Sequence, residues 1–166
     1  MLRNRKLQIA LSLVILSIFA VFAFRVFSHC EIPCGIYDDE MRIEMMAEHI
    51  TTIEKSMNQI MELSSMEEEN YNQIVRWVTN KDNHADKLSY IITQYFMTQR
   101  IEPKEISHDE EYMGYVEKIT TLHKMMYHSM KSKQTTDLEH VKSLRKLLED
   151  FEVAYFGHEL GETHQH

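Results

Sequence analysis

Nine residues near the N-terminus, 29–37, read His-Cys-Glu-Ile-Pro-Cys-Gly-Ile-Tyr and offer the donors of a metal site. His29, Cys30 and Cys34 place one imidazole and two thiols within six residues. If a protease cuts between Ser28 and His29, the mature chain also begins with a free amine. An amine, a deprotonated backbone amide and two thiolates supply a planar set of donors, which suits Ni(II) or Cu(II) better than tetrahedral zinc. We call residues 29–37 the hook.

A disulfide is the alternative use of Cys30 and Cys34, the two cysteines of the chain. Cysteines of exported proteins commonly pair, and this pair would close a small loop. Three residues separate the two thiols, so the spacing is not that of a CxxC redox pair. No further cysteine completes a four-thiolate zinc site. From these residues alone, the metal site and the disulfide both stay open.

Residues 1–28 have the pattern of a cleavable leader peptide. Three basic residues precede an apolar run over 9–24, and the small residue Ser28 ends the stretch before the expected cut. An uncleaved membrane anchor is the alternative, because the run is close to the ~20 residues that span a bilayer. We expect export to the periplasm or the cell exterior. A membrane-tethered chain, or a cytoplasmic chain with a processed leader, is the alternative location.

Length and charge limit the classes of function. Loss of the leader would leave 138 of the 166 residues, which is one ordinary domain. The formal net charge is −8, and because the leader holds four basic residues and no acidic ones, the mature charge would be −12. Such an acidic protein is a poor nucleic-acid binder, since phosphates need positive charge. A small anionic substrate would need a local positive field.

The rest of the chain predicts an all-α fold. Apolar residues recur at three-four spacing in four segments, which predicts helices over about 38–60, 66–99, 109–132 and 136–156. Asp38 or Asp39 can cap the first start. The other three starts are predicted from capping boxes at Ser65–Glu68, Ser107–Glu110 and Thr136–Glu139, and Gly157 predicts the last end. Short links favour an antiparallel up-down four-helix bundle over 38–157, with a flexible tail over 158–166.

Each predicted helix should bury one stripe of apolar residues, which we call its seam. The residues expected to face the core are Ile43, Met46, Ile50, Ile53, Met57, Ile60, Tyr71, Ile74, Val78, Ala85, Leu88, Ile92, Tyr95, Tyr112, Tyr115, Ile119, Leu122, Met126, Val141, Leu144, Leu148, Phe151 and Tyr155. The helical histidines lack the two Glu-x-x-His pairs that a di-iron bundle needs.

The hook resembles the N-terminal segment of the nickel superoxide dismutase family. That family has the pattern HCxxPCGxY at its processed N-terminus, followed by a four-helix bundle. All six fixed positions match, as His29, Cys30, Pro33, Cys34, Gly35 and Tyr37. Beyond the hook, the resemblance extends to the triplet 42–44 and to the pair 95–96.

This resemblance implies a dismutase that converts superoxide and protons to oxygen and hydrogen peroxide. It implies one nickel ion per chain, cycling between Ni2+ and Ni3+, and a hexamer of chains. His29, Cys30 and Cys34 would be the metal ligands, with the imidazole of His29 as an axial ligand in the oxidised state. Tyr37 would stand beside the open face and position superoxide or water. A maturation protease must then free the amine of His29.

Three further residues would hold this site in place. Pro33 restricts the backbone between the two thiolates, and Gly35 can take the positive φ that a turn demands. By resemblance, Glu44 hydrogen-bonds the axial imidazole, although its spacing from Tyr37 is one residue shorter than in the family pattern. The arginine that partners this glutamate in the family falls on Asn80 here.

The basic partner of Glu44 could then be Arg76 or Lys81. Two other functions stay open beside the dismutase. One is an exported metal-binding or metal-delivery bundle that uses the hook without turnover. The other is a membrane-tethered helical module in which Cys30 and Cys34 form a disulfide.

Overall fold

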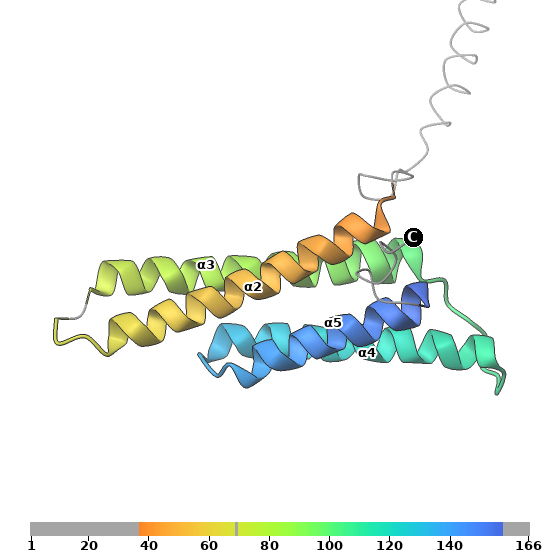
Figure 1. Ribbon diagram of the computed structural model, residues 1–166. Coiled ribbons are helices and arrows are strands. Elements are labelled where there is room, and N and C mark those ends of the chain that lie inside the picture. The colour runs from red at the N-terminus through yellow and green to blue at the C-terminus, as the bar shows by residue number, and fades with distance from the viewer. Residues whose placement is uncertain (1–36, 69, 158–166) are drawn as a thin grey trace, which may run out of the picture. The chain divides into compact units, whose positions relative to one another are not determined.

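A computed structural model describes residues 37–68 and 70–157 of the chain. The chain divides into two units, Met1–Tyr37 and Asp38–His166. The described residues of the second unit form four long α-helices: α2 (Asp39–Ser64), α3 (Tyr71–Tyr90), α4 (Glu110–Gln134) and α5 (Glu139–Phe156) (Figure 1). Helix α3 continues directly into a π-helix, η1 (Ile91–Arg100). The described residues contain no strand, so the all-helical prediction is confirmed.

Contacts between the helices give their directions. Helix α2 runs antiparallel to α3, because His49 meets His84 while Ser56, further along α2, meets the earlier residue Asn80. Helix α4 runs antiparallel to α3, because its last turn lies at Lys81 and Ser129 lies at Ala85. The α2–α3 and α4–α5 hairpins pack together as a four-helix bundle (Figure 1).

The core follows the predicted seams most closely in α2 and α5. All six seam residues predicted on α2 are buried, and so are four of the five on α5; these are Ile43, Met46, Ile50, Ile53, Met57, Ile60, Val141, Leu144, Leu148 and Phe151. Phe96 of η1 also lies in the core, where its ring meets Phe151 and Tyr155 edge to face at centroid distances of 5.0 and 5.4 Å. These aromatic rings join η1 to the end of α5.

The three capping boxes predicted from the sequence are wrong. Helix α3 begins at Tyr71 rather than Met66, and its cap is Asn70, whose side chain accepts from the backbone N–H of Gln73. Asp109 caps α4 by accepting from the N–H of Tyr112 at 2.8 Å. Helix α5 begins at Glu139. In each case an Asp or Asn near the start offers a carboxylate or amide oxygen to the free N–H groups of the first turn.

The predicted seam of α3 is also wrong over its first turns. Tyr71 and Val78 are exposed, and so is Val75. The cause is the length of the α2–α3 hairpin: the last turn of α4 meets α3 only at Lys81. The first ten residues of α3 therefore pack on α2 alone, and their remaining apolar side chains lie at the surface.

Lys81 is a cation at a buried position of α3, where it binds the end of α4. Its side chain is almost fully buried, and its Nζ donates to the carbonyl oxygens of Ser132 and Lys133 at 2.6 and 2.8 Å. It also pairs with Asp82 at 2.8 Å. The last carbonyls of an α-helix lack partners within the helix, and a cation there also complements the helix dipole. Lys81 thus ties the end of α4 to α3.

Two histidine pairs bridge neighbouring helices. The Nδ1 atoms of His49 and His84 lie 3.2 Å apart, as do those of His128 and His140. One ring can donate to the other only if at least one is neutral. Burial lowers the pKa of His49, and the positive charges of His84 and Lys87 lower it further. Burial likewise lowers the pKa of His84 and of His128.

We expect the stability of the metal-free bundle to fall as these histidines become protonated. Their folded-state pKa values lie below the ordinary 6.5, so the unfolded chain takes up protons first as the pH falls. The stabilisation is therefore complete above pH 6.5 and is lost as the pH falls through the folded-state values. Thermal unfolding between about pH 8 and about pH 5 measures this slope. His84→Gln should flatten it, whereas His123→Gln, at an exposed position, should not; equal slopes in all three proteins would contradict the expectation.

Candidate functional site

Most of the hook lies outside the described residues. This applies to His29, Cys30, Pro33, Cys34 and Gly35, and equally to the leader and the C-terminal tail. Tyr37 is the first described residue, and its side chain is exposed. The ligand set and the role of Tyr37 therefore stay predictions. The structure describes the point where the hook joins the bundle, at the start of α2.

Asp38 and Asp39 have separate tasks at this junction. Asp38 is the N-cap of α2, because its side chain accepts from the backbone N–H of Met41 at 3.0 Å. Its own N–H donates to the hydroxyl of Tyr95 at 2.9 Å. The peptide directly after Tyr37 is thus bound to η1, on a different part of the bundle.

The carboxylate of Asp39 is held by three side chains from two other elements. The hydroxyls of Tyr95 and Tyr155 donate to it at 2.6 and 2.9 Å. The guanidinium of Arg100 donates from Nε to both carboxylate oxygens, at 2.8 and 3.1 Å, and from Nη2 to one of them at 2.6 Å. Only 16% of the Asp39 side chain is exposed, against 28% for Arg100. We call Asp39, Tyr95, Arg100 and Tyr155 the Asp39 cluster; it ties the first turn of α2 to the ends of η1 and α5.

The π-helix explains why Tyr95 and Arg100 reach the same carboxylate. Residues five apart in an α-helix point about 140° away from each other. In a π-helix the hydrogen bonds join residues five apart, so such residues lie nearly above one another. The bond from Ile101 N–H to Phe96 C=O, 2.9 Å long, has this spacing at the end of η1. The widened turns thus place both donors on the face toward α2.

Electrostatics keep the Asp39 cluster in one protonation state. Burial by itself would raise the pKa of Asp39, but the hydrogen bonds from Arg100, Tyr95 and Tyr155 together lower it. Burial and the bond to Asp39 raise the pKa of both tyrosines to about 12. Around neutral pH the carboxylate is ionised and both hydroxyls keep their protons, so every donor keeps its acceptor.

Glu44 lies on α2 with an exposed side chain. The structure joins it to none of the basic partners considered from the sequence. Asn80 donates to Ser56 Oγ at 3.0 Å, three turns further along α2, and Lys81 is bound to the end of α4. Arg76 lies on the exposed face of the first turns of α3. Lys81 as the partner of Glu44 is therefore wrong in this structure.

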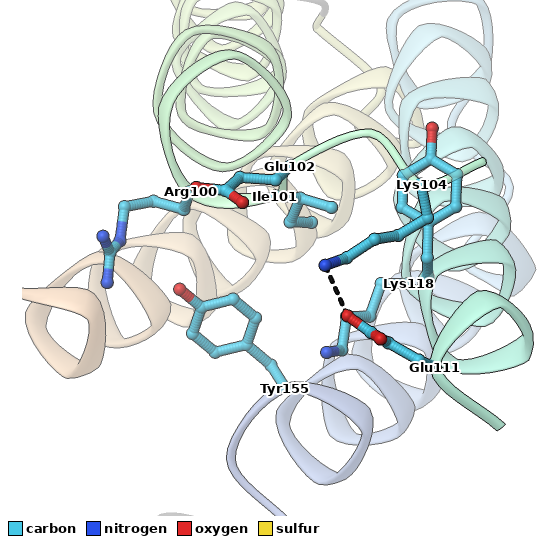
Figure 2. A pocket seen from close by; sticks show the side chains of 8 residues that line it. Arg100, Ile101, Glu102, Lys104, Glu111, Lys118 and Tyr155 are labelled. Carbon is cyan, nitrogen blue, oxygen red and sulfur yellow. Dashed lines mark ion pairs between the residues drawn. The ribbon is translucent and has the colours of Figure 1, made fainter.

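A pocket of about 310 Å³ opens beside the Asp39 cluster, with Arg100 and Tyr155 in its lining. The amines of Lys104 and Lys118 point into it, and Lys104 pairs with Glu111 (Figure 2). Asp39 pairs with Arg100, and Glu111 pairs with Lys104. The pocket therefore carries little excess positive charge. We assign it no ligand.

Sequence reasoning missed the Asp39 cluster. Asp39 was considered only as a cap, Tyr95 and Tyr155 only as core residues, and Arg100 not at all. The available signals were two adjacent aspartates at a helix start and the family match at Tyr95-Phe96. Neither predicts contacts with residues 56 to 116 positions away in the chain.

Within residues 37–68 and 70–157, no three His, Cys, Asp or Glu side chains are grouped so as to hold a metal ion. No helix in the same ranges is both long and apolar enough to cross a bilayer.

The chain matches a known protein family. The sequence model of a family described as nickel-containing superoxide dismutase matches residues 24–159, a range that includes the hook and all four helices. No curated protein and no solved structure matches the chain.

Proposed function

The chain belongs to the nickel-containing superoxide dismutase family, a family of oxidoreductases, and we propose that it converts two superoxide ions and two protons to oxygen and hydrogen peroxide. The observation that carries this proposal is the length of the family match, which spans the hook together with all four helices. The four-helix bundle agrees with the fold that the family resemblance implies.

The donors of the hook fit nickel. Cys30 and Cys34 would bind as thiolates, and His29 would contribute its N-terminal amine and its imidazole. No thiol elsewhere in the chain could build a tetrahedral zinc site of the four-cysteine type. When bound, nickel supplies the one-electron couple that accepts an electron from one superoxide and donates it to the next.

The remaining hook residues would fix the shape of the site and position the substrate. Pro33 and Gly35 would fix the path of the loop, so that both thiolates face one ion without a large ordering cost. Tyr37 would place its hydroxyl where superoxide or water enters, and could hold a proton that peroxide needs. Its exposed position at the start of the bundle is compatible with this role.

Glu44 is proposed to accept a hydrogen bond from the imidazole of His29. We expect Glu44→Ala to keep the fold, because the side chain is exposed, and to reduce superoxide turnover by about ten-fold or more. Circular dichroism and turnover of the nickel-loaded variant measure the two effects. Full activity in Glu44→Ala together with a loss in Glu48→Ala, one turn further along, would move the role to Glu48.

Export and assembly belong to the same proposal. The leader would be cut between Ser28 and His29, leaving a mature chain outside the cytoplasm. The family resemblance implies a hexamer of chains. Exposed apolar side chains on the first turns of α3, Tyr71, Val75 and Val78, offer surface to a neighbouring copy.

The test is superoxide turnover by the mature chain that begins at His29. The nickel-loaded protein should consume superoxide well above the background rate, and the zinc-loaded protein should not. Nickel bound without turnover would instead support a metal-binding or metal-delivery protein.

A further inference from the structure

The start of α2 is held more firmly than a helix start requires. A single N-cap oxygen commonly serves the free N–H groups of a first turn, and Asp38 provides it. Asp39 accepts five further hydrogen bonds, all from Tyr95, Arg100 and Tyr155 on other elements. The carboxylate of Asp39 therefore fixes where the first turn of α2 lies, while Asp38 caps it.

The backbone ahead of this turn is held as well. The hydroxyl of Tyr95 accepts from the N–H of Asp38 while it donates to the carboxylate of Asp39. One side chain thus fixes both the helix and the direction in which the chain leaves it. The guanidinium of Arg42 lies over the same ring, 5.0 Å from its centroid, and limits the movement of Tyr95.

The distance along the chain to the hook is short. Asp39 lies five positions after Cys34, which is a span of roughly 17 Å at most. A thiolate on so short a segment can explore little space if the end of the segment is fixed, and more if it is loose. The cost of ordering a binding loop falls when its origin is fixed beforehand.

From this arrangement we propose that Asp39 is a positioning residue for the nickel hook: bound by Tyr95, Arg100 and Tyr155, it anchors the origin of the hook so that Cys34 is presented to the metal. The inference rests on the proposed function, because it takes the hook as the nickel site. Asp39 touches neither metal nor superoxide in this account. Its effect passes through the backbone of residues 35–38.

The experiment compares two variants that each remove one charge from α2. Asp39→Asn weakens the Asp39 cluster. Glu54→Gln breaks the ion pair between Glu54 and Arg145, which joins the same helices, α2 and α5, away from the hook. Nickel affinity is measured by competition with a chelator, and the oxidised nickel centre is examined by electron paramagnetic resonance. The thermal midpoint of each metal-free protein shows the effect on the fold.

Asp39→Asn is expected to lower nickel affinity by about ten-fold, the size of loss that removal of the outer partners of a metal site typically causes. The resonance of the oxidised centre should broaden, because a less fixed hook allows a wider range of ligand geometries. Glu54→Gln should leave both at the parent values, even where the thermal midpoint falls equally. Asp39→Glu, which keeps the charge, should recover part of the affinity. If Asp39→Asn retains the affinity and resonance of the parent, or changes them no more than Glu54→Gln does, the inference is overturned.

A milder variant covers the case in which Asp39→Asn does not fold. Tyr155→Phe removes one hydrogen bond from the Asp39 cluster and keeps the ring in its place. Nickel affinity should then fall by about three-fold, in line with one hydrogen bond; an unchanged affinity would overturn the inference. If the parent chain binds nickel but does not consume superoxide, the proposed function is wrong. The nickel affinities of the variants still decide whether Asp39 positions the hook.

Discussion

A chain with one alanine added before His29 is expected to fold into the same bundle and to lose nickel binding and essentially all superoxide turnover. The added residue turns the N-terminal amine into an amide, which is a far poorer donor, and it displaces the imidazole from its chelating position. The addition should not change the fold, since the buried apolar residues of the described chain lie between Ile43 and Phe151, away from the N-terminus. Circular dichroism, nickel affinity and superoxide turnover measure the three effects.

The matched control adds the same alanine after His166, at the other end of the chain. That protein keeps the amine of His29 and should bind nickel and consume superoxide like the parent. If both extended proteins lose activity, the loss does not come from the N-terminal donor.

The second large effect concerns the identity of the metal. We expect about one nickel per chain in the active protein and no turnover in the zinc-loaded protein, because zinc has no redox couple at this site. Copper should bind at least as strongly as nickel by the Irving–Williams order, so delivery rather than affinity must exclude it in the cell. Elemental analysis of each loaded protein, combined with turnover, tests this.

The state of the thiols tests the same prediction independently. Cys30 and Cys34 must both be reduced to bind nickel as thiolates. Intact mass of the freshly isolated active protein should therefore show no loss of two hydrogens. Active protein with a Cys30–Cys34 disulfide, or with stoichiometric zinc, would contradict the assignment of nickel to the hook.

Local sequence patterns correctly predicted the features that depend only on neighbouring residues, such as the buried face of α2 and the end of α5. Six apolar residues at three-four spacing define one face of α2, and all six are buried, because a single stripe can face the core in only one way. Gly157 ends α5 as expected, with φ +84°, a conformation open to glycine. The hook was recognisable for the same reason, since its donors lie within nine residues.

Features that depend on contacts between distant residues were not predictable. The capping boxes failed where a nearby Asp109 or Asn70 offered the better acceptor. The predicted seam of α3 was wrong over its first turns, because the sequence does not show where α4 stops packing against α3. The burial of Lys81 was not predictable either, because it depends on the carbonyls at the end of α4, about 50 positions away.

The Asp39 cluster lay furthest from prediction. It depends on the π-helical turns of η1, which bring Tyr95 and Arg100 onto one face, and on Tyr155, 116 positions away from Asp39. Periodicity at 3.6 residues cannot show such a face. This is also the feature that anchors the hook, so the sequence predicted the donors of the proposed site but not their support.

Removal of the added residue from the extended chain, in the presence of nickel, tests the central claim most directly. A protease site placed before His29 allows the same sample to be followed before and after cleavage, with intact mass reporting the fraction trimmed. Superoxide consumption should be near background at first and should rise in proportion to the chains that begin at His29. If the uncut protein consumes superoxide as fast as the trimmed one, the N-terminal hook is not the catalytic site.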